Sequence, residues 1–326
     1  MKTINYILPA MTHLRYFIPI IIEANKKNIQ NNVFVCSCNG KYNSARKNLS
    51  LLHDMSKKYN FHITDNCSFS GVTFQIEGDD CNIKKSENET RVSLTYMTDF
   101  NISYKNYIDK VDYVVFPSKK FAEYFDTVSN KNIYLGSPKY DVCLNKKDIL
   151  KKYNIKENKK RALIIFPRSR DESKIEIKKI YKALKEEGYE ILVKTRGKDR
   201  INNKDYKGDY YFEDNSWFPH TTMELIKVSD IIVNFSSTVI KETIILEKPM
   251  INFHIKPFKR PLDFLYDFKF VIEHGNNVDV SKIKEDVNLL TTSNIINKDE
   301  YKKAKKKHLF TSKNVSKLIL EKLLDV

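Results

Sequence analysis

Three hydroxyl side chains follow a strand-like run in the segment DIIVNFSSTVIKETIILEKPMINF, which spans residues 230–253. They belong to Ser236, Ser237 and Thr238, where a helix-like run begins, and Glu242 comes four residues after Thr238. The N–H groups and dipole of a helix N-terminus favour an anion, typically by about 0.3–1 kcal/mol. Hydroxyl donors beside them would form a phosphate site, and a carboxylate one turn further suits a ribose. The alternative is a capped helix with a solvated first-turn acid.

Cationic side chains stand at the ends of two earlier strand-like runs. Arg168 and Arg170 follow the first run, and Lys194 and Arg196 end the second. The carboxyl ends of parallel strands meet at one edge of a sheet, so the four cations and the three hydroxyls would share that edge and suit a diphosphate. The alternative is chance, because any loop of a chain with 57 lysines and arginines carries some of them.

Two residues of the first half are candidates for a general base. Transfer to a hydroxyl group requires a side chain that accepts the hydroxyl proton. His13 follows the first strand-like run and starts a helix-like one, and Arg15 could steer an anionic acceptor. Asp99, after the strand-like run at 92–98, is the second candidate. The alternative for His13 is a helix-capping residue without a catalytic role.

His220 is a further candidate for a contact with the donor, because it immediately precedes a helix-like run on the same predicted edge. Thr221 and Glu224 have the spacing of a capping box, so we expect Glu224 to be structural. We interpret Asp79 and Asp80 as part of a turn and expect no metal site.

The elements that must position these residues alternate between strand-like and helix-like runs. This alternation predicts an α/β fold with mostly parallel sheets, namely two Rossmann-like βα domains that face a cleft. We expect an acceptor-binding domain at 1–140, a charged linker at 141–160 and a nucleotide-donor-binding domain at 161–290. The C-terminal helices at 291–326 could pack back on the first domain. Predicted strands lie at 5–10, 32–38, 61–64, 92–98, 112–117, 132–136, 161–167, 189–195, 209–214, 230–235, 249–253 and 269–274.

The composition is that of a folded protein with an excess of positive charge. Hydrophobic residues make up 41% of the 326 residues, which argues against disorder, and the longest apolar run, 16–22, is too short to span a bilayer. We expect no signal peptide, and five cysteines without metal-like spacing are expected to be reduced thiols. The net charge of +16 favours anionic partners such as nucleotide phosphates, lipid head groups or nucleic acid.

Several segments carry a family resemblance. Residues 229–253 resemble the donor-site segment of GT-B glycosyltransferases and of two related groups, the CDP-glycerol glycerophosphotransferases and the UDP-N-acetylglucosamine 2-epimerases. DKVDYVVFPSKKFAEYF (109–125) and KNIYLGSPKYD (131–141) resemble the last βαβ unit of their N-terminal domains, and LFTSKNVSKLILEKL (309–323) resembles their C-terminal helix. The resemblance covers most of residues 90–326 and implies the GT-B fold.

The resemblance also implies roles for individual residues. Ser236, Ser237 and Thr238 would hold phosphate, Glu242 would bind the ribose, and the loop near 217–219 would contact the base. Two departures from the relatives stand out. The relatives often carry His-Gly where this chain has Asp99. The epimerases have two glycines beside the serine of the turn, whereas this chain reads NFSST, which argues against an epimerase.

The leading hypothesis is a metal-independent GT-B glycosyltransferase that moves a sugar from a UDP-, CMP- or GDP-activated donor to a glycan or glycolipid precursor of a cell-surface polysaccharide. One alternative keeps the fold and transfers polyol phosphate from a CDP-glycerol-type donor. A second is a basic nucleic-acid-binding protein, although no recognised RNA- or DNA-binding motif is present. We expect no cofactor besides the donor substrate, no nucleic-acid partner and a cytoplasmic location. The basic segment 298–310 could contact anionic lipid, or be a solvated charged face.

Overall fold

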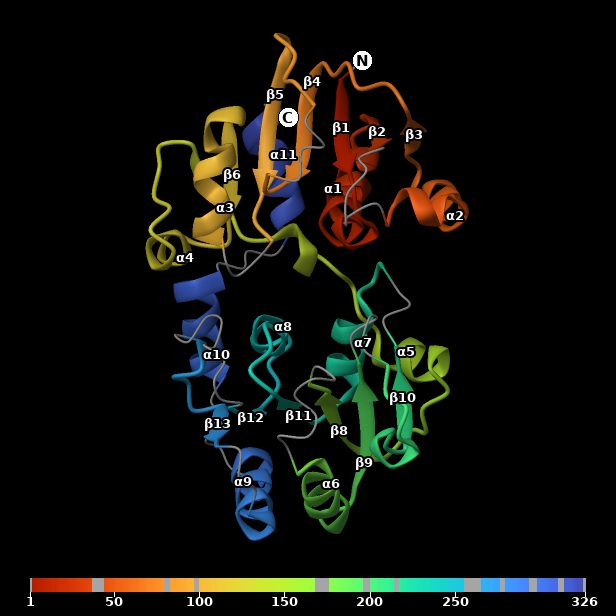
Figure 1. The fold of residues 1–326 in the computed structure, drawn as a ribbon, viewed down its shortest axis with the longest axis vertical. Helices are drawn as coiled ribbons and strands as arrows, with labels where there is room; N and C mark the ends of the chain where they lie inside the picture. Colours follow the sequence, from red (N-terminus) through yellow and green to blue (C-terminus); the bar gives the residue numbers. More distant parts are fainter. Residues whose placement is uncertain are drawn as a thin grey trace. The chain divides into compact units, whose positions relative to one another are not determined.

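The computed structural model of the chain forms two compact units (Figure 1). Unit 1 comprises Met1–Val142 and Lys306–Val326, and unit 2 comprises Cys143–Lys305. The structure describes residues 2–36, 44–78, 83–96, 100–167, 176–195, 200–213, 217–254, 265–275, 279–292, 298–309 and 314–324.

Unit 1 is built on a parallel sheet in the order β3-β2-β1-β4-β5-β6-β7. Its strands are β1 (Thr3–Leu8), β2 (Gln30–Val35), β3 (His62–Thr64), β4 (Gly71–Ile76), β5 (Glu89–Leu94), β6 (Tyr113–Phe116) and β7 (Asn132–Tyr134). Its α-helices are α1 (Leu14–Lys26), α2 (Leu49–Tyr59), α3 (Phe100–Tyr107), α4 (Lys119–Tyr124) and α11 (Val315–Leu324). The strand order reverses between β1 and β4, which is where open parallel sheets bind ligands.

Unit 2 has a parallel sheet in the order β10-β9-β8-β11-β12-β13. Its strands are β8 (Lys160–Ile165), β9 (Tyr189–Lys194), β10 (Tyr210–Phe212), β11 (Ile231–Asn234), β12 (Met250–Phe253) and β13 (Val271–His274). Its α-helices are α5 (Lys146–Lys152), α6 (Ile177–Glu186), α7 (Thr221–Val228), α8 (Ile240–Ile245), α9 (Val280–Thr292) and α10 (Lys298–Ala304). The order reverses between β8 and β11. The prediction of an α/β fold with two Rossmann-like domains is confirmed.

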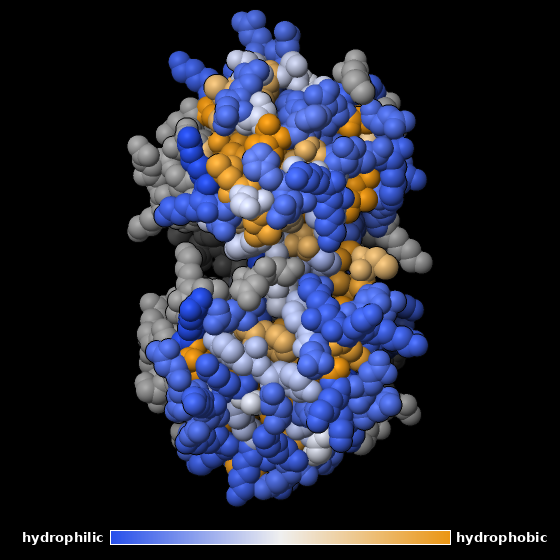
Figure 2. All heavy atoms as spheres, turned by 90° about the vertical axis from the view of Figure 1, so that its right-hand side faces the viewer, coloured by the Kyte–Doolittle hydropathy of each residue, from blue (hydrophilic) through white to orange (hydrophobic). Residues whose placement is uncertain are grey.

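The core of each unit follows from the residue pattern of its strands and helices. Strands covered on both faces require continuous apolar runs, and β8 and β11 supply them. In unit 2, α6 and α9 pack against each other and turn their apolar residues towards the sheet. Figure 2 shows one face of the molecular surface, which is mostly hydrophilic and has smaller apolar areas between the polar residues. Apolar side chains scattered over a surface in this way are usual for soluble domains.

Strand β4 is the one strand of unit 1's sheet that is absent from the predicted strands. It lies between β1 and β5 in the middle of the sheet, yet it contains Thr73 and Gln75, both fully buried. Val72, Phe74 and Ile76 alternate with these polar residues, and such an alternation is typical of a strand. The predicted strands therefore lack the neighbour of β1 at the switch point, although the sequence carries a signal for it.

The segment predicted as a linker, 141–160, contains helix α5, which packs against α7 in unit 2. The predicted block of C-terminal helices also divides, because α10 belongs to unit 2 and α11 to unit 1. Helix α11 packs on α1, and the carboxylate of Asp141 accepts hydrogen bonds from the backbone N–H groups of Val315 and Ser316. Burial raises the pKa of Asp141, and these hydrogen bonds oppose the shift.

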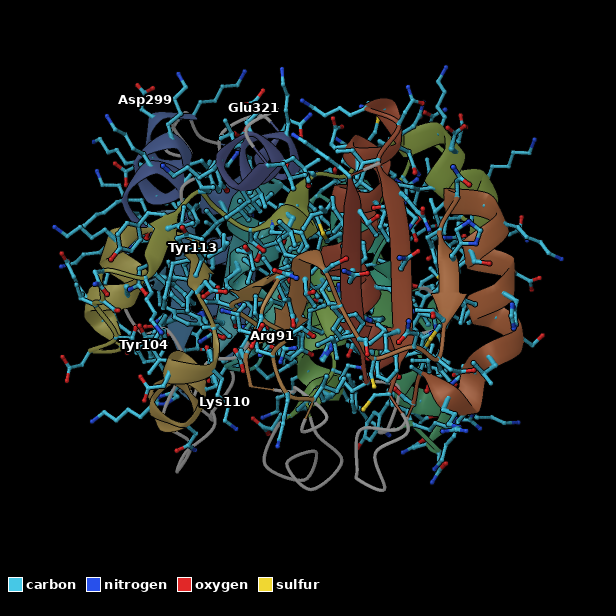
Figure 3. The ribbon with its side chains drawn as sticks, turned by 90° about the horizontal axis from the view of Figure 1, so that it is seen from above. Arg91, Tyr104, Lys110, Tyr113, Asp299 and Glu321 are labelled. Atoms are coloured by element: carbon cyan, nitrogen blue, oxygen red, sulfur yellow. The ribbon has the colours of Figure 1, made fainter. Side chains whose placement is uncertain are left out.

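A buried ion pair fixes the described part of the connection between β4 and β5. Arg91 is 1% exposed, and Figure 3 shows it in the interior of the view, whereas Glu321 lies at the rim. The Nε atom of Arg91 is 2.7 Å from Glu89 Oε1, and its Nη1 atom is 2.7 Å from the carbonyl oxygen of Ile83. Burial of a guanidinium and a carboxylate costs much free energy unless the two are paired in this way.

Cys36, at the end of β2, is disulfide-bonded, so the expectation of reduced thiols is wrong for this residue. Cys67 and Cys143 are free and exposed. Within the described ranges, no helix is both long and apolar enough to cross a membrane. The same ranges contain no group of three His, Cys, Asp or Glu residues that could hold a metal ion.

Candidate active site

The turn between β11 and α8 carries the three hydroxyl groups that the sequence predicts as a phosphate site. Ser236 has a φ of 51°, in the left-handed region, so the chain turns sharply after β11. Val239 occupies the N-cap of α8 and makes no side-chain capping bond. The hydroxyls therefore precede the helix and do not cap it, which disfavours the capped-helix alternative.

Hydrogen bonds hold both ends of this turn. The backbone N–H of Ser236 donates to Asn252 Oδ1 at 3.0 Å, and the Tyr266 hydroxyl donates to the Ser237 carbonyl oxygen at 3.0 Å. Asn234 Nδ2 donates to Asn252 Oδ1 at 2.9 Å and reaches the Ser237 carbonyl oxygen at 3.3 Å. The turn is thus fixed by side chains from β11, from β12 and from residue 266.

Two polar atoms at the turn are buried without a hydrogen-bond partner in the described part of the chain. They are Ser236 Oγ and Asn234 Oδ1. Nearly all buried polar atoms in proteins are satisfied, and the exceptions call for an explanation such as a ligand or water. A hydroxyl such as Ser236 Oγ can donate to a phosphate oxygen, and an amide oxygen such as Asn234 Oδ1 can accept from a hydroxyl.

Glu242, the predicted ribose ligand, lies in the first turn of α8 and is 3% exposed. Lys241, beside it, is also buried, at 9% exposure. Burial of a carboxylate and an ammonium on one short helix is costly unless both are paired or bind a ligand. Glu242 therefore follows the turn after a few residues of the chain, and its side chain is shielded from bulk solvent.

The predicted diphosphate cations are only partly within the described residues. Arg168, Arg170 and Arg196 lie outside them. Lys194, the last residue of β9, is 5% exposed, and its Nζ donates to the carbonyl oxygen of Thr195. A phosphate contact by Lys194 stays a prediction, and it would require the side chain to leave this carbonyl.

His220 occupies the N-cap of α7 after a cis Phe218–Pro219 peptide bond, and its Nε2 lies 3.3 Å from Thr222 Oγ1. The capping box predicted for Thr221 and Glu224 is not formed, because no side chain caps α7. Glu224 instead accepts hydrogen bonds from Lys152 Nζ at 2.7 Å and from the Tyr153 hydroxyl at 2.5 Å. These bonds join α7 to the segment of α5, and a structural role for Glu224 stays a prediction.

In unit 1, His13 ends the short 3₁₀ helix η1 (Met11–His13), which follows β1 at the switch point. It is 3% exposed, and burial, assisted by the charge of Arg15, lowers its pKa to about 3. The ring lies edge-on to Tyr96, with 5.7 Å between centroids. The imidazole is therefore neutral at physiological pH, and with this pKa it is a weaker base than an unperturbed histidine.

Other polar groups gather at the same edge of unit 1. Tyr96 follows β5, and its backbone N–H donates to Glu77 Oε1 at 2.9 Å. Glu77 follows β4 and is 7% exposed. The second candidate base, Asp99, lies outside the described residues. Among the described residues, His13, Glu77 and Tyr96 come from three neighbouring strand ends of one sheet.

The sequence does not predict the polar residues behind the turn between β11 and α8. Asn234, Asn252 and Glu273 stand opposite one another on β11, β12 and β13, and Asn252 Nδ2 donates to Glu273 Oε1 at 3.1 Å. A weak signal exists, because two strand-like runs end in the same pair of residues, in VNF and INF. Their pairing depends on strand register, which no local pattern specifies.

The stability of unit 1 is expected to fall as the pH decreases from about 6.5, the pKa of an unperturbed histidine. Burial of His13 lowers its folded pKa to about 3, so between these values the unfolded chain binds the proton and the folded chain does not. Stability is fully present above pH 6.5 and is lost towards pH 3, with a slope of about 1.4 kcal/mol per pH unit. Burial of His308 acts in the same direction, since it lowers that pKa to about 4.

Urea denaturation at pH 7, 6 and 5 measures this dependence. His13→Gln should show a shallower decline than the wild type, and His53→Gln, on an exposed position of α2, serves as the control. Equal slopes for wild type and His13→Gln would contradict a depressed pKa for His13.

Comparison with known proteins identifies a family whose model matches most of the chain. A family model described as CDP-Glycerol:Poly(glycerophosphate) glycerophosphotransferase matches residues 81–324, which include the turn between β11 and α8. No curated protein matches the sequence.

Solved structures resemble the fold at low sequence identity. The wall teichoic acid polymerase TagF, soaked with CDPG, has a TM-score of 0.68 and 15% identity, over 99% of this chain and 88% of that chain. A UDP-GlcNAc 2-epimerase from Neisseria meningitidis bound to UDP-GlcNAc has a TM-score of 0.63 and 14% identity over all of both chains. A glycosyltransferase from Rickettsia africae has a TM-score of 0.51 and 13% identity, over 99% and 98%. At these identities the likeness shows the fold alone.

Proposed function

The chain belongs to the CDP-glycerol:poly(glycerophosphate) glycerophosphotransferase family, and from this premise we propose that it transfers a polyol phosphate from a CDP-activated donor to a hydroxyl group of a polymer. The family match carries the proposal, because it includes the turn where Ser236 Oγ and Asn234 Oδ1 are buried without partners in the described part of the chain. The two buried atoms offer one donor and one acceptor to a ligand that has both phosphate and hydroxyl groups.

The reaction is a displacement at phosphorus. The acceptor hydroxyl oxygen forms a bond to the phosphorus that carries the polyol, and the bond from that phosphorus to the oxygen of the CMP phosphate breaks. CMP leaves with the electron pair, and the proton of the acceptor hydroxyl passes to a base. Catalysis of this kind rests on positioning and on stabilising charge at the phosphate oxygens.

The residues of unit 2 supply the donor half of this scheme. Ser236, Ser237 and Thr238 would donate to the diphosphate, and Glu242 would accept from the ribose hydroxyls. Within the described part of the chain, the backbone N–H groups of Ser237 and Thr238 donate to no other group, so they can serve the same phosphates. Arg168, Arg170, Lys194 and Arg196 would balance the charge of the leaving group, and His220 would contact the donor. The proposal requires no metal ion.

The residues of unit 1 supply the acceptor half. His13 is the proposed base, with Asp99 as the alternative, and the pKa of about 3 that burial gives His13 makes it a weak base at neutral pH. Arg15 would attract an anionic acceptor, and the net charge of +16 favours both an anionic donor and an anionic polymer.

The same charge supports a cytoplasmic protein that touches anionic lipid at the membrane periphery. Lysines of α10 and of the π-helix η8 (Lys305–Leu309) are exposed, namely Lys302, Lys303, Lys306 and Lys307. Ion pairs of Lys302 with Asp299 and of Lys303 with Glu300 reduce this charge, so the contact would be weak and salt-sensitive.

Transfer of a sugar from a nucleotide sugar is the second candidate. The observation that favours it is the likeness to a UDP-GlcNAc 2-epimerase over the whole of both chains. Family membership favours transfer of a polyol phosphate over transfer of a sugar. The sequence alone ranks the two reactions in the opposite order.

A thermal-shift panel tests the donor class. CDP-glycerol at 100 times its Kd is expected to stabilise the protein by about 2.7 kcal/mol, and therefore to raise the Tm, whereas UDP-GlcNAc and a GDP-sugar at equal concentration should not. A shift with UDP-GlcNAc alone would favour sugar transfer, and no shift with any nucleotide would contradict the donor site. CMP is the informative partial ligand, because it lacks the second phosphate.

A further inference from the structure

A row of three polar side chains crosses the sheet of unit 2 directly behind the donor turn. Asn234, Asn252 and Glu273 are aligned by the parallel register of β11, β12 and β13, so they share one face of the sheet. Asn234 and Asn252 are 0% exposed, whereas Glu273 is exposed. Buried amides in a parallel sheet are costly unless every polar atom has a use.

The charge of Glu273 sets the direction of the hydrogen bonds along the row. A carboxylate can only accept a hydrogen bond, so Asn252 presents its Nδ2 to Glu273 Oε1. Asn252 Oδ1 then faces the other way, where it accepts from Asn234 Nδ2 at 2.9 Å and from the Ser236 backbone N–H at 3.0 Å. The orientation of both amides therefore follows from one carboxylate at the end of the row.

The row holds Ser236, the residue of the turn with the least favourable backbone conformation. Ser236 is left-handed, with a φ of 51°, which costs free energy for any residue with a side chain. Its N–H is held by Asn252, and the Ser237 carbonyl oxygen is held by Tyr266 at 3.0 Å. The Ser236 N–H is consequently not available to a phosphate, while Ser236 Oγ is buried without a partner among the described residues.

We propose that Asn252 and Glu273 are positioning residues for the donor. They hold Ser236 in the left-handed conformation and so place its hydroxyl, and the N–H groups of Ser237 and Thr238, for the diphosphate. This inference rests on the proposed function, since it assigns the row to the same donor site. Neither residue touches the reacting atoms.

Exchanging the amide of Asn252 and the acid of Glu273 tests the row. The exchange reverses the direction of the hydrogen bond between positions 252 and 273, and it keeps an acceptor oxygen at position 252 facing the Ser236 N–H. Asn252→Asp alone places two carboxylates in contact, and it is expected to raise the Kd for CDP-glycerol about tenfold, the loss of one good hydrogen bond. In the double variant Asn252→Asp/Glu273→Gln, the glutamine can donate to the aspartate, so the Kd should return to within about threefold of wild type.

Glu273→Ala provides a variant that is expected to fold, because the side chain is exposed. It releases Asn252 to rotate and should raise the Kd several-fold. Glu273→Gln alone still offers an acceptor oxygen and should have a smaller effect than Glu273→Ala. Asp279→Ala, an exposed acid in the same unit, is the matched control and should bind as the wild type does.

Calorimetric titration with CDP-glycerol, beside the Tm of each ligand-free variant, separates positioning from folding. If the two residues position the donor site, the Kd should rise in Asn252→Asp and recover in the double variant, measured at a temperature where all variants are folded. The KM for the donor should also change more than kcat. Equal Kd values for wild type, Asn252→Asp and Glu273→Ala would overturn the inference while leaving the proposed function intact. So would a double variant that regains its Tm but not its affinity. A wild type that binds no CDP-glycerol would overturn both.

Discussion

Replacing His13 with glutamine is expected to lower kcat by about 10²- to 10⁴-fold, the usual contribution of a general base. His13 lies at the switch point of unit 1 on η1, and burial keeps its imidazole neutral by lowering its pKa to about 3. Glutamine keeps the size and polarity of the site but cannot accept a proton at neutral pH. Initial rates at saturating donor and acceptor, measured from pH 5 to pH 8, test this expectation.

The control for His13 is His308→Gln, the other histidine of unit 1 whose pKa is lowered by burial. It should change kcat by less than about threefold, because surface and packing substitutions act mainly on stability. Donor affinity should be unchanged in His13→Gln, since the residues that we propose to bind the donor lie in unit 2. An unchanged kcat in His13→Gln would mean that the residue is a packing residue, and Asp99→Asn would become the decisive variant.

Replacing Glu242 with glutamine is expected to raise the Kd for the donor about 10- to 100-fold. Hydrogen bonds to a charged group contribute about 1.5–3 kcal/mol, and each 1.4 kcal/mol is a factor of ten in Kd. Glu242 is 3% exposed on α8, so a ribose bound there would exchange little of this interaction with water. Titration with CDP-glycerol and with CMP measures the effect, and both ligands should lose affinity because both carry the ribose.

Glu247→Gln is the matched control on the segment that follows α8. Its carboxylate forms an ion pair with Lys305 at 2.8 Å and its side chain is 41% exposed. Exposed pairs contribute about 0–1 kcal/mol, and this one should not affect the donor. If Glu242→Gln binds both ligands as tightly as the wild type does, the ribose assignment fails even though the family assignment stands.

The sequence was most informative where buried parallel strands give continuous apolar runs. Segments such as RALIIFP and DIIVNF could be assigned as strands, and the residues after them could be placed at a strand end without knowing the sheet order. His13, Ser236 and Glu242 were selected on that basis. Strand β4 is missing from the prediction because Thr73 and Gln75 break the continuous apolar run expected of a buried strand, although the resulting alternation is also typical of a strand.

The contacts between elements could not be predicted from the sequence. The spacing of Thr221 and Glu224 predicts a capping box, yet Glu224 binds Lys152, 72 positions away in the chain. Lys194 ends its strand as expected, but its ammonium group donates to a neighbouring backbone carbonyl. The left-handed Ser236 and its support by Asn252 depend on the register of β11 against β12, which is set by packing of the whole sheet.

The identity of the released nucleotide tests the central claim most directly. Purified protein is incubated with CDP-glycerol and a poly(glycerophosphate) acceptor, and the products are followed by phosphorus NMR and nucleotide chromatography. Attack on phosphorus predicts CMP in an amount equal to new phosphodiester bonds, and much less in His13→Gln. Turnover of a nucleotide sugar with release of the nucleoside diphosphate, and no CMP from CDP-glycerol, would contradict the account.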